Sequence, residues 1–223
     1  KFRRGLMFRQ FMSGIPSGIT EMSPGIVTFI FNRFIVAFMH ERELIIYSIL
    51  SYVILLATVL ANGIAQGAQP LVSYYHGRHE RDAFHAIFGY EIKSGILLAA
   101  VEAVLIVAFG KYIALLFIGE GDGLATDIVY ALRLVAVAFP LLSMNVIIAG
   151  YLTALERSRV AIVISLMRCT LTLIVALAII VALFGTETVW RSLAISEMMC
   201  FVIAVLLYKK TRRVAIAETF DDM

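Results

Sequence analysis

LIIYSILSYVILLATVLANGIAQGAQPLVSYY, residues 44–75, is a run of 32 residues without a charged side chain. About 20 predominantly apolar residues in an α-helix are enough to cross the hydrocarbon core of a bilayer. Because this stretch is longer than that and carries only scattered polar side chains, we predict that it is a transmembrane helix.

Apolar stretches of similar character occupy most of the chain on either side. Of the 223 residues, 61% are apolar and only 16% are charged, which excludes an ordinary soluble domain. Short polar connectors separate the stretches and leave no room for a catalytic or nucleotide-binding domain. We therefore predict an all-α integral membrane protein, a bundle of six transmembrane helices. The predicted spans are 11–38, 44–75, 86–109, 124–153, 160–184 and 188–208.

The basic residues predict how the bundle is oriented, because Lys and Arg accumulate in cytoplasmic loops. If the chain crosses six times, twelve of these basic residues fall on the side of the two termini and three fall on the other side. The first set comes from residues 1–9, 78–81, 157–159 and 209–213, and the second is Arg42, Lys111 and Arg191. We expect a multi-pass protein of the cell membrane with both termini in the cytoplasm. The net charge of +3 then reflects topology, and no nucleic-acid partner is expected.

The ends of the chain fit that orientation. Residues 1–10, KFRRGLMFRQ, begin without an initiator Met and show no secretory signal, so we expect a basic cytoplasmic linker cut from a longer protein. Residues 209–223 are expected to form a cytoplasmic tail.

Four charged residues lie near the middle of predicted spans: Glu21, Arg133, Arg168 and Glu197. A charge at the bilayer centre costs roughly 3 kcal/mol, so such residues usually face a partner or a cavity. Two acids and two bases at similar depth predict buried ion pairs. The pairs either serve transport or only hold helices together.

Glu21 is the candidate for binding an ion. It lies between Pro16 and Pro24, each of which removes a backbone donor and can bend or unwind the helix. A buried carboxylate beside freed carbonyls is a plausible site for H⁺ or Na⁺. The alternative is a structural carboxylate that neighbouring side chains satisfy.

Asn62, Gln66 and Gln69 recur at spacings of three or four and so share one face of the second predicted helix. This face either lines a cavity for substrate or bridges to other helices by hydrogen bonds. Asn145, which follows a proline in the fourth span, is a further cavity candidate. We expect no metal site, no cofactor other than the coupling ion, and no enzymatic activity, because the chain shows no metal-ligand cluster and no paired nucleophile and base.

Three segments carry a resemblance to a known family. GIAQGAQPLVSYYHGRHE, residues 63–80, resembles the eighth-helix signature of the multidrug and toxic compound extrusion (MATE) transporters. GIPSGITEMSPGIVTFIFN, residues 14–32, resembles the seventh helix of that family. FPLLSMNVIIAGYLTALERSRVAIVISLMR, residues 139–168, is similar to its tenth and eleventh helices.

The resemblance implies one lobe of a twelve-helix antiporter that exports cationic or amphipathic drugs in exchange for H⁺ or Na⁺ by alternating access. This chain would be the C-terminal lobe, with membrane lipid and an N-terminal six-helix lobe as partners. The family's seventh-helix acid falls on Glu21. The acid that some members carry in the tenth helix has no clear counterpart, since Asp127 lies near the outer end and the middle holds Arg133 and Asn145.

Two other functions stay open. A flippase for lipid-linked oligosaccharide, from the same superfamily, would use a cationic cavity to which Arg133 and Arg168 would contribute. A free-standing six-helix channel or scaffold would instead assemble as a homo-oligomer around the polar face of the second helix.

Overall fold

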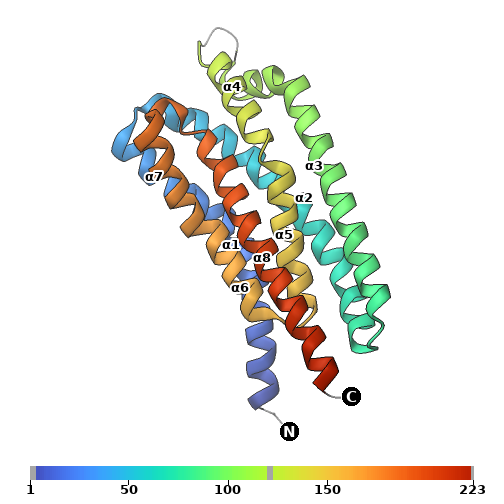
Figure 1. The fold of residues 1–223 in the computed structure, drawn as a ribbon. Helices are drawn as coiled ribbons and strands as arrows, with labels where there is room; N and C mark the ends of the chain where they lie inside the picture. Colours follow the sequence, from blue (N-terminus) through green and yellow to red (C-terminus); the bar gives the residue numbers. More distant parts are fainter. Residues whose placement is uncertain (1–3, 120–122, 222–223) are drawn as a thin grey trace.

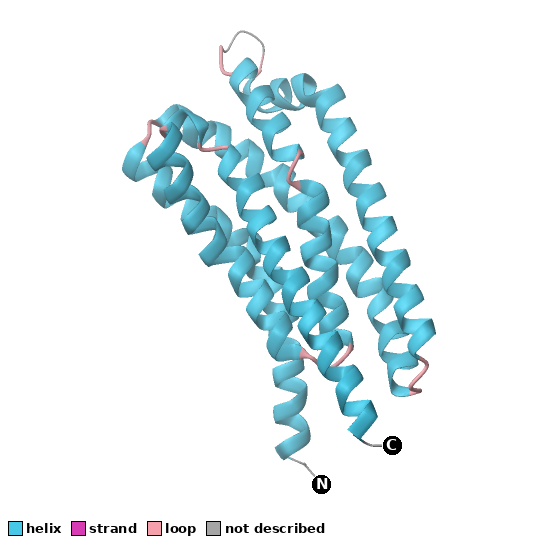
Figure 2. Ribbon diagram, viewed as in Figure 1, coloured by secondary structure: helices cyan, strands magenta, loops and turns pink. Residues whose placement is uncertain are grey.

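The computed structural model describes residues 4–119 and 123–221, and these residues form helices joined by short loops (Figures 1 and 2). The α-helices are α1 (Arg4–Phe38), α2 (Glu41–Gly77), α3 (Arg81–Ile118), α4 (Ala125–Ala136), α5 (Phe139–Ala154), α6 (Ser158–Leu166), α7 (Thr172–Phe184) and α8 (Arg191–Asp221). A π-helical turn, η1 (Met167–Leu171), joins α6 to α7, and a 3₁₀ turn, η2 (Thr186–Thr188), precedes α8.

These helices make up to six crossings of a membrane. Within the described residues, five helical runs are long and apolar enough to span, and the bent pair α4 and α5 forms the sixth. Both chain ends lie at the same end of the bundle (Figure 1), as an even number of crossings requires. The six-helix bundle predicted from the apolar stretches is therefore confirmed.

The helices extend further than the predicted spans. Helix α3 continues through residues 110–118, which we expected in a connector, and α8 continues to Asp221 rather than ending near 208. Residues 110–118 carry a single charge, Lys111, which sits near the helix end where a long side chain reaches polar surroundings. One lysine therefore did not end the helix.

The main break lies in the fourth span and not in the first. Helices α4 and α5 meet at 43° across Val137 and Ala138, shortly before Pro140 in the first turn of α5. Pro140 has no N–H to donate to the carbonyl four residues earlier, which interrupts the hydrogen-bond ladder there. Helix α1, in contrast, is continuous through positions 16 and 24, so the unwinding expected beside Glu21 is absent.

Helix α5 lies at the centre of the bundle and is buried along almost its whole length. It packs closely on α2 and α3 because a glycine lies at each contact: Gly150 of α5 faces α2, and Gly95 of α3 faces α5. A Cβ on Gly150 would lie 3.0 Å from the Cβ of Ala65, and one on Gly95 would collide with the side chain of Ile147. At the end away from the termini, Tyr47 stacks against Phe31 with ring centroids 4.7 Å apart.

Candidate functional site

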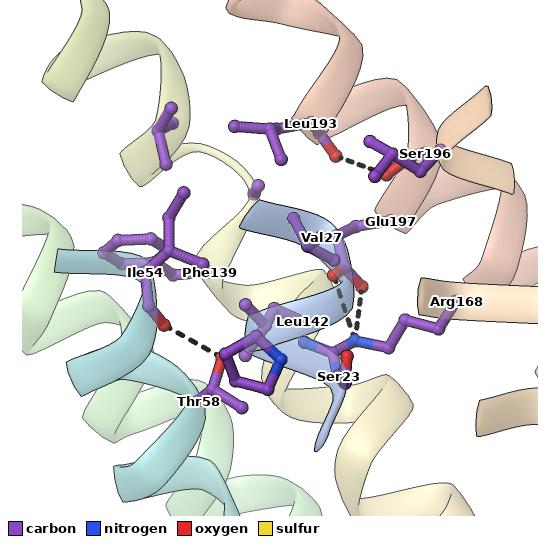
Figure 3. A pocket seen from close by; sticks show the side chains of 14 residues that line it. Ser23, Val27, Ile54, Thr58, Phe139, Leu142, Arg168, Leu193, Ser196 and Glu197 are labelled. Atoms are coloured by element: carbon purple, nitrogen blue, oxygen red, sulfur yellow. Dashed lines mark hydrogen bonds and ion pairs between the residues drawn. The ribbon is translucent and has the colours of Figure 1, made fainter. Parts of the chain in front are cut away.

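A buried ion pair joins α8 to the π-helical turn. Arg168 Nε donates to Glu197 Oε1 at 3.0 Å and to Oε2 at 3.3 Å (Figure 3). The two residues are only 7% and 8% exposed. Because both charges are removed from solvent, each depends on the other for compensation.

Two more side chains add hydrogen bonds to this pair. Asn145 Nδ2 donates to Glu197 Oε2 at 2.7 Å and to the Glu197 carbonyl oxygen at 3.0 Å. Arg168 Nη1 donates to Ser23 Oγ at 3.2 Å. We call Ser23, Asn145, Arg168 and Glu197 the buried polar cluster. It ties together α1, α5, η1 and α8.

A small cavity of about 20 Å³ adjoins the buried polar cluster. Its polar wall includes Ser23, Arg168 and Glu197, with Thr58 and Ser196 nearby, and its apolar wall includes Phe139 (Figure 3). A space of this size accommodates about one water molecule. Because Ala138 and Phe139 belong to the lining, the cavity lies directly at the break between α4 and α5.

A second polar group lies on the surface formed by α1 and α2. Gln66 Nε2 donates to Glu21 Oε1 at 2.7 Å, and Asn62 Nδ2 donates to the same oxygen at 3.3 Å. Asn62 is buried, whereas Glu21 and Gln66 are exposed. Within the described part of the chain, Glu21 Oε2 accepts no hydrogen bond. We call Glu21, Asn62 and Gln66 the surface carboxylate group.

The two groups are neighbours. Glu21 and Ser23 lie two residues apart on α1, and Ser23 is buried while Glu21 is exposed. Thr20 Oγ1 and Ser165 Oγ are 3.1 Å apart and join α1 to α6 beside the buried polar cluster. Gln69 is half-buried and lines a cavity of about 30 Å³ together with Asn62 and Gln66.

The structure differs from the sequence-based expectations at two charged residues. Glu21 was expected to be buried, but it is exposed on this lobe. Arg133 was expected in a buried ion pair, but its side chain is exposed and makes no ion pair with any residue in the described ranges. The reason is helical phase, since the buried face of α4 carries Leu132 and Val135 and turns position 133 outward.

Asp127, the other acid considered in this span, pairs with Arg42 at the end of the bundle away from the termini. It therefore lies far from the buried polar cluster and does not supply a second acid there. The pair instead ties the start of α2 to the start of α4.

Sequence reasoning missed Ser23 and Glu91. Ser23 was overlooked because a hydroxyl is common in transmembrane helices, and only its arginine partner makes it notable. Glu91 is 4% exposed in α3, and its Oε2 has no hydrogen-bond partner within the described residues. Its position inside the predicted span 86–109 was the available signal.

Among the described residues, no group of three or more His, Cys, Asp or Glu side chains is placed to hold a metal ion.

Comparison with known proteins adds to this geometry. The sequence profile of the MatE family matches residues 16–179. A search of curated protein sequences found no match.

Solved structures of MATE transporters share the fold. A crystal structure of MATE in complex with MaL6 superposes with a TM-score of 0.87 at 17% identity, over 98% of this chain and 49% of that one. An outward-facing multidrug resistance MATE family transporter of the MOP superfamily superposes with a TM-score of 0.87 at 18% identity, over 98% of this chain and 49% of that one. An inward-facing transporter of the same family superposes with a TM-score of 0.81 at 19% identity, over 98% of this chain and 50% of that one. The chain thus spans about half the length of these transporters.

Proposed function

Because the chain belongs to the MatE family, whose sequence profile covers residues 16–179, we propose that it is the C-terminal lobe of a cation-coupled antiporter. The whole transporter exports drugs or toxic organic cations in exchange for H⁺ or Na⁺ by alternating access. It resides in the cell membrane with both termini in the cytoplasm, and an N-terminal six-helix lobe completes it.

The observation that carries this proposal is the surface carboxylate group. Glu21 presents a carboxylate on the outside of the lobe, within a transmembrane helix, while Asn62 and Gln66 hold one of its oxygens. A carboxylate exposed on one lobe is costly against lipid but suits a polar cavity between two lobes. This placement supports a cavity lined by the α1 and α2 surface.

The hydrogen bonds assign different tasks to the two carboxylate oxygens. Both amides donate to Oε1, which fixes the orientation of the group. Oε2 is left to accept H⁺, Na⁺ or the charged nitrogen of an organic cation. A single carboxylate that binds either the coupling ion or the substrate makes their binding mutually exclusive, and this exclusion is the requirement for exchange.

The proposal is tested by drug-dependent ion exchange in proteoliposomes that contain the full-length transporter. Glu21→Gln keeps the size of the side chain but removes its charge, so we expect exchange to fall at least about tenfold, the loss of one charged hydrogen bond. Glu187→Gln, which removes an exposed acid from the η2 turn, is the matched control and should exchange like wild type. Separate H⁺ and Na⁺ gradients identify the ion.

If Glu21→Gln exchanges at the wild-type rate, the carboxylate is structural and the proposal fails at this residue. Abundance and detergent stability of both variants are measured in parallel, so that a folding defect is recognised as such.

The flippase alternative is favoured by one observation, the exposed Arg133 side chain on α4. Its other expected contributor, Arg168, is buried and paired with Glu197, so it adds no net positive charge to a cavity. The same liposomes, loaded with a lipid-linked pyrophosphate sugar, test whether Arg133→Gln reduces lipid transfer. Cation exchange without lipid transfer rejects the flippase.

A further inference from the structure

A larger cavity lies at the end of the bundle where the termini are found. It measures about 340 Å³ and is lined by the end of α2, the start of α3, the end of α5, the α5–α6 connection and residues 208–212 of α8. It is separate from the buried polar cluster and from the surface carboxylate group, with which it shares no lining residue. Nothing in the proposed exchange reaction uses it.

The charged lining of this cavity is mainly basic. Arg81, Arg157 and Arg212 contribute guanidinium groups from three different segments, and Asp82 is the only acid among the described residues of the lining. Arg212 also lies close enough to His85 and to two tyrosines of the wall to interact with them electrostatically. Of the acids nearby, Glu80 is paired with Arg78 at 2.6 Å. Glu156 interacts electrostatically with His76, another residue of the lining.

The inner wall is aromatic and apolar. Tyr151 is buried, stacks on Phe88 with centroids 4.1 Å apart, and shares a hydrogen bond of 3.0 Å between its OH and His85 Nδ1. The ring of Tyr208 lies 6.2 Å from that of Tyr151, and Leu152 and Leu155 continue the apolar surface. The cavity thus offers cations and an apolar wall within one space.

We propose that this cavity binds the phosphate headgroup of an anionic phospholipid. Guanidinium groups bind phosphate oxygens in pairs of parallel hydrogen bonds, and a mainly basic lining favours a headgroup with a net negative charge over a zwitterionic one that adds a cationic amine. A basic pocket between transmembrane helices at the membrane surface is the expected receptor for an anionic headgroup. The apolar wall formed by Leu152, Leu155 and Tyr208 suits the glycerol and first acyl carbons, and this favours a lipid over free phosphate.

The test is a binding titration of the full-length transporter in detergent with phosphatidylglycerol, phosphatidylcholine and inorganic phosphate as separate probes. Two variants weaken the site, Arg212→Gln and Arg157→Gln. Lys210→Gln is the matched control, because Lys210 is exposed on α8 two residues from Arg212 but does not line the cavity. Binding is read by native mass spectrometry and by the shift in thermal unfolding, neither of which depends on transport.

We expect phosphatidylglycerol to bind, each of the two variants to weaken it about tenfold, and Lys210→Gln to leave it within about twofold. Raising the salt concentration should weaken binding as well. If both arginine variants bound phosphatidylglycerol as tightly as wild type, the proposed binding site would be wrong. Equal binding of phosphatidylcholine would overturn recognition of charge, and binding of inorganic phosphate without phosphatidylglycerol would overturn the assignment to lipid.

Discussion

At the residue scale, the buried polar cluster joins two buried charges of this lobe, Arg168 and Glu197, into one compensated unit. Arg168 is held by Glu197 and Ser23, and Glu197 by Arg168 and Asn145. The desolvation cost of such a pair is offset only when both partners are present and hydrogen-bonded. Removing one partner of the pair is therefore expected to lower the stability of the folded protein far more than removing both.

Glu197→Leu should lower stability strongly, by about 3–5 kcal/mol, because it leaves the Arg168 charge buried and uncompensated. The double variant Arg168→Met with Glu197→Leu should recover most of that loss. Apparent unfolding temperatures of the two variants and wild type, measured in the same detergent, check this. A double variant as unstable as the single one would show that the loss does not come from an uncompensated Arg168 charge.

At the element scale, the contact between α3 and α5 depends on the absence of a side chain at Gly95. A Cβ there would collide with Ile147 Cδ1 and would meet Ser143 Oγ at 2.7 Å, so both side chains would have to move. A Cβ on Gly89, in the same helix, would have no neighbouring atom within 4 Å, so this position tolerates an added methyl group.

Gly95→Ala should therefore destabilise the bundle by about 1–3 kcal/mol, the usual cost of overpacking. Gly89→Ala is the control and should be neutral or slightly stabilising, because alanine favours the helix. Thermal unfolding of both variants in detergent measures the difference. Equal unfolding temperatures would mean that Ile147 and Ser143 adjust without cost.

The bend between α4 and α5 is the second feature at this scale. Pro140→Ala restores a backbone donor, so we expect the two helices to straighten. Spin labels at Tyr130 in α4 and Arg159 in the first turn of α6, just beyond the end of α5, report a distance that spans the bend. The background has Cys169 and Cys200 replaced by alanine. A lengthened distance supports proline as the cause, and an unchanged one assigns the bend to packing at Val137 and Ala138.

At the scale of the whole molecule, the proposed topology places the connectors alternately on the two sides of the membrane. His79→Cys should react with an impermeant thiol reagent only from the cytoplasm, and Glu187→Cys only from outside. Both side chains are exposed in the structure, so burial does not limit the reaction. Labelling of both from one side would contradict six crossings.

Much of this architecture was predictable, because apolar length alone determines which segments cross a bilayer. The partners of the charged residues were less predictable. Depth along a helix places Arg168, Arg133 and Glu197 at similar levels, but rotation about the helix axis decides which of them meet, and packing sets that rotation. The exposure of Glu21 was unpredictable for a different reason, since hydropathy does not distinguish a surface that faces another lobe from a buried one.

The bend was also misplaced by sequence reasoning. Two prolines in the first span indicated a break beside Glu21, yet the interruption occurs before Pro140. A proline in a helix removes one donor at either site, and the neighbouring helices decide whether the chain then bends. Local sequence does not contain that information.

The pairing of Arg168 with Glu197 has an electrical consequence. A membrane potential does about 2.3 kcal/mol of work per 100 mV on each elementary charge that crosses it. The pair has no net charge, so a rearrangement that moves it as a unit through the field is electrically silent. Of the two acids Glu21 and Glu197, only Glu21 can then contribute voltage dependence, and its contribution vanishes whenever a monovalent cation occupies that carboxylate.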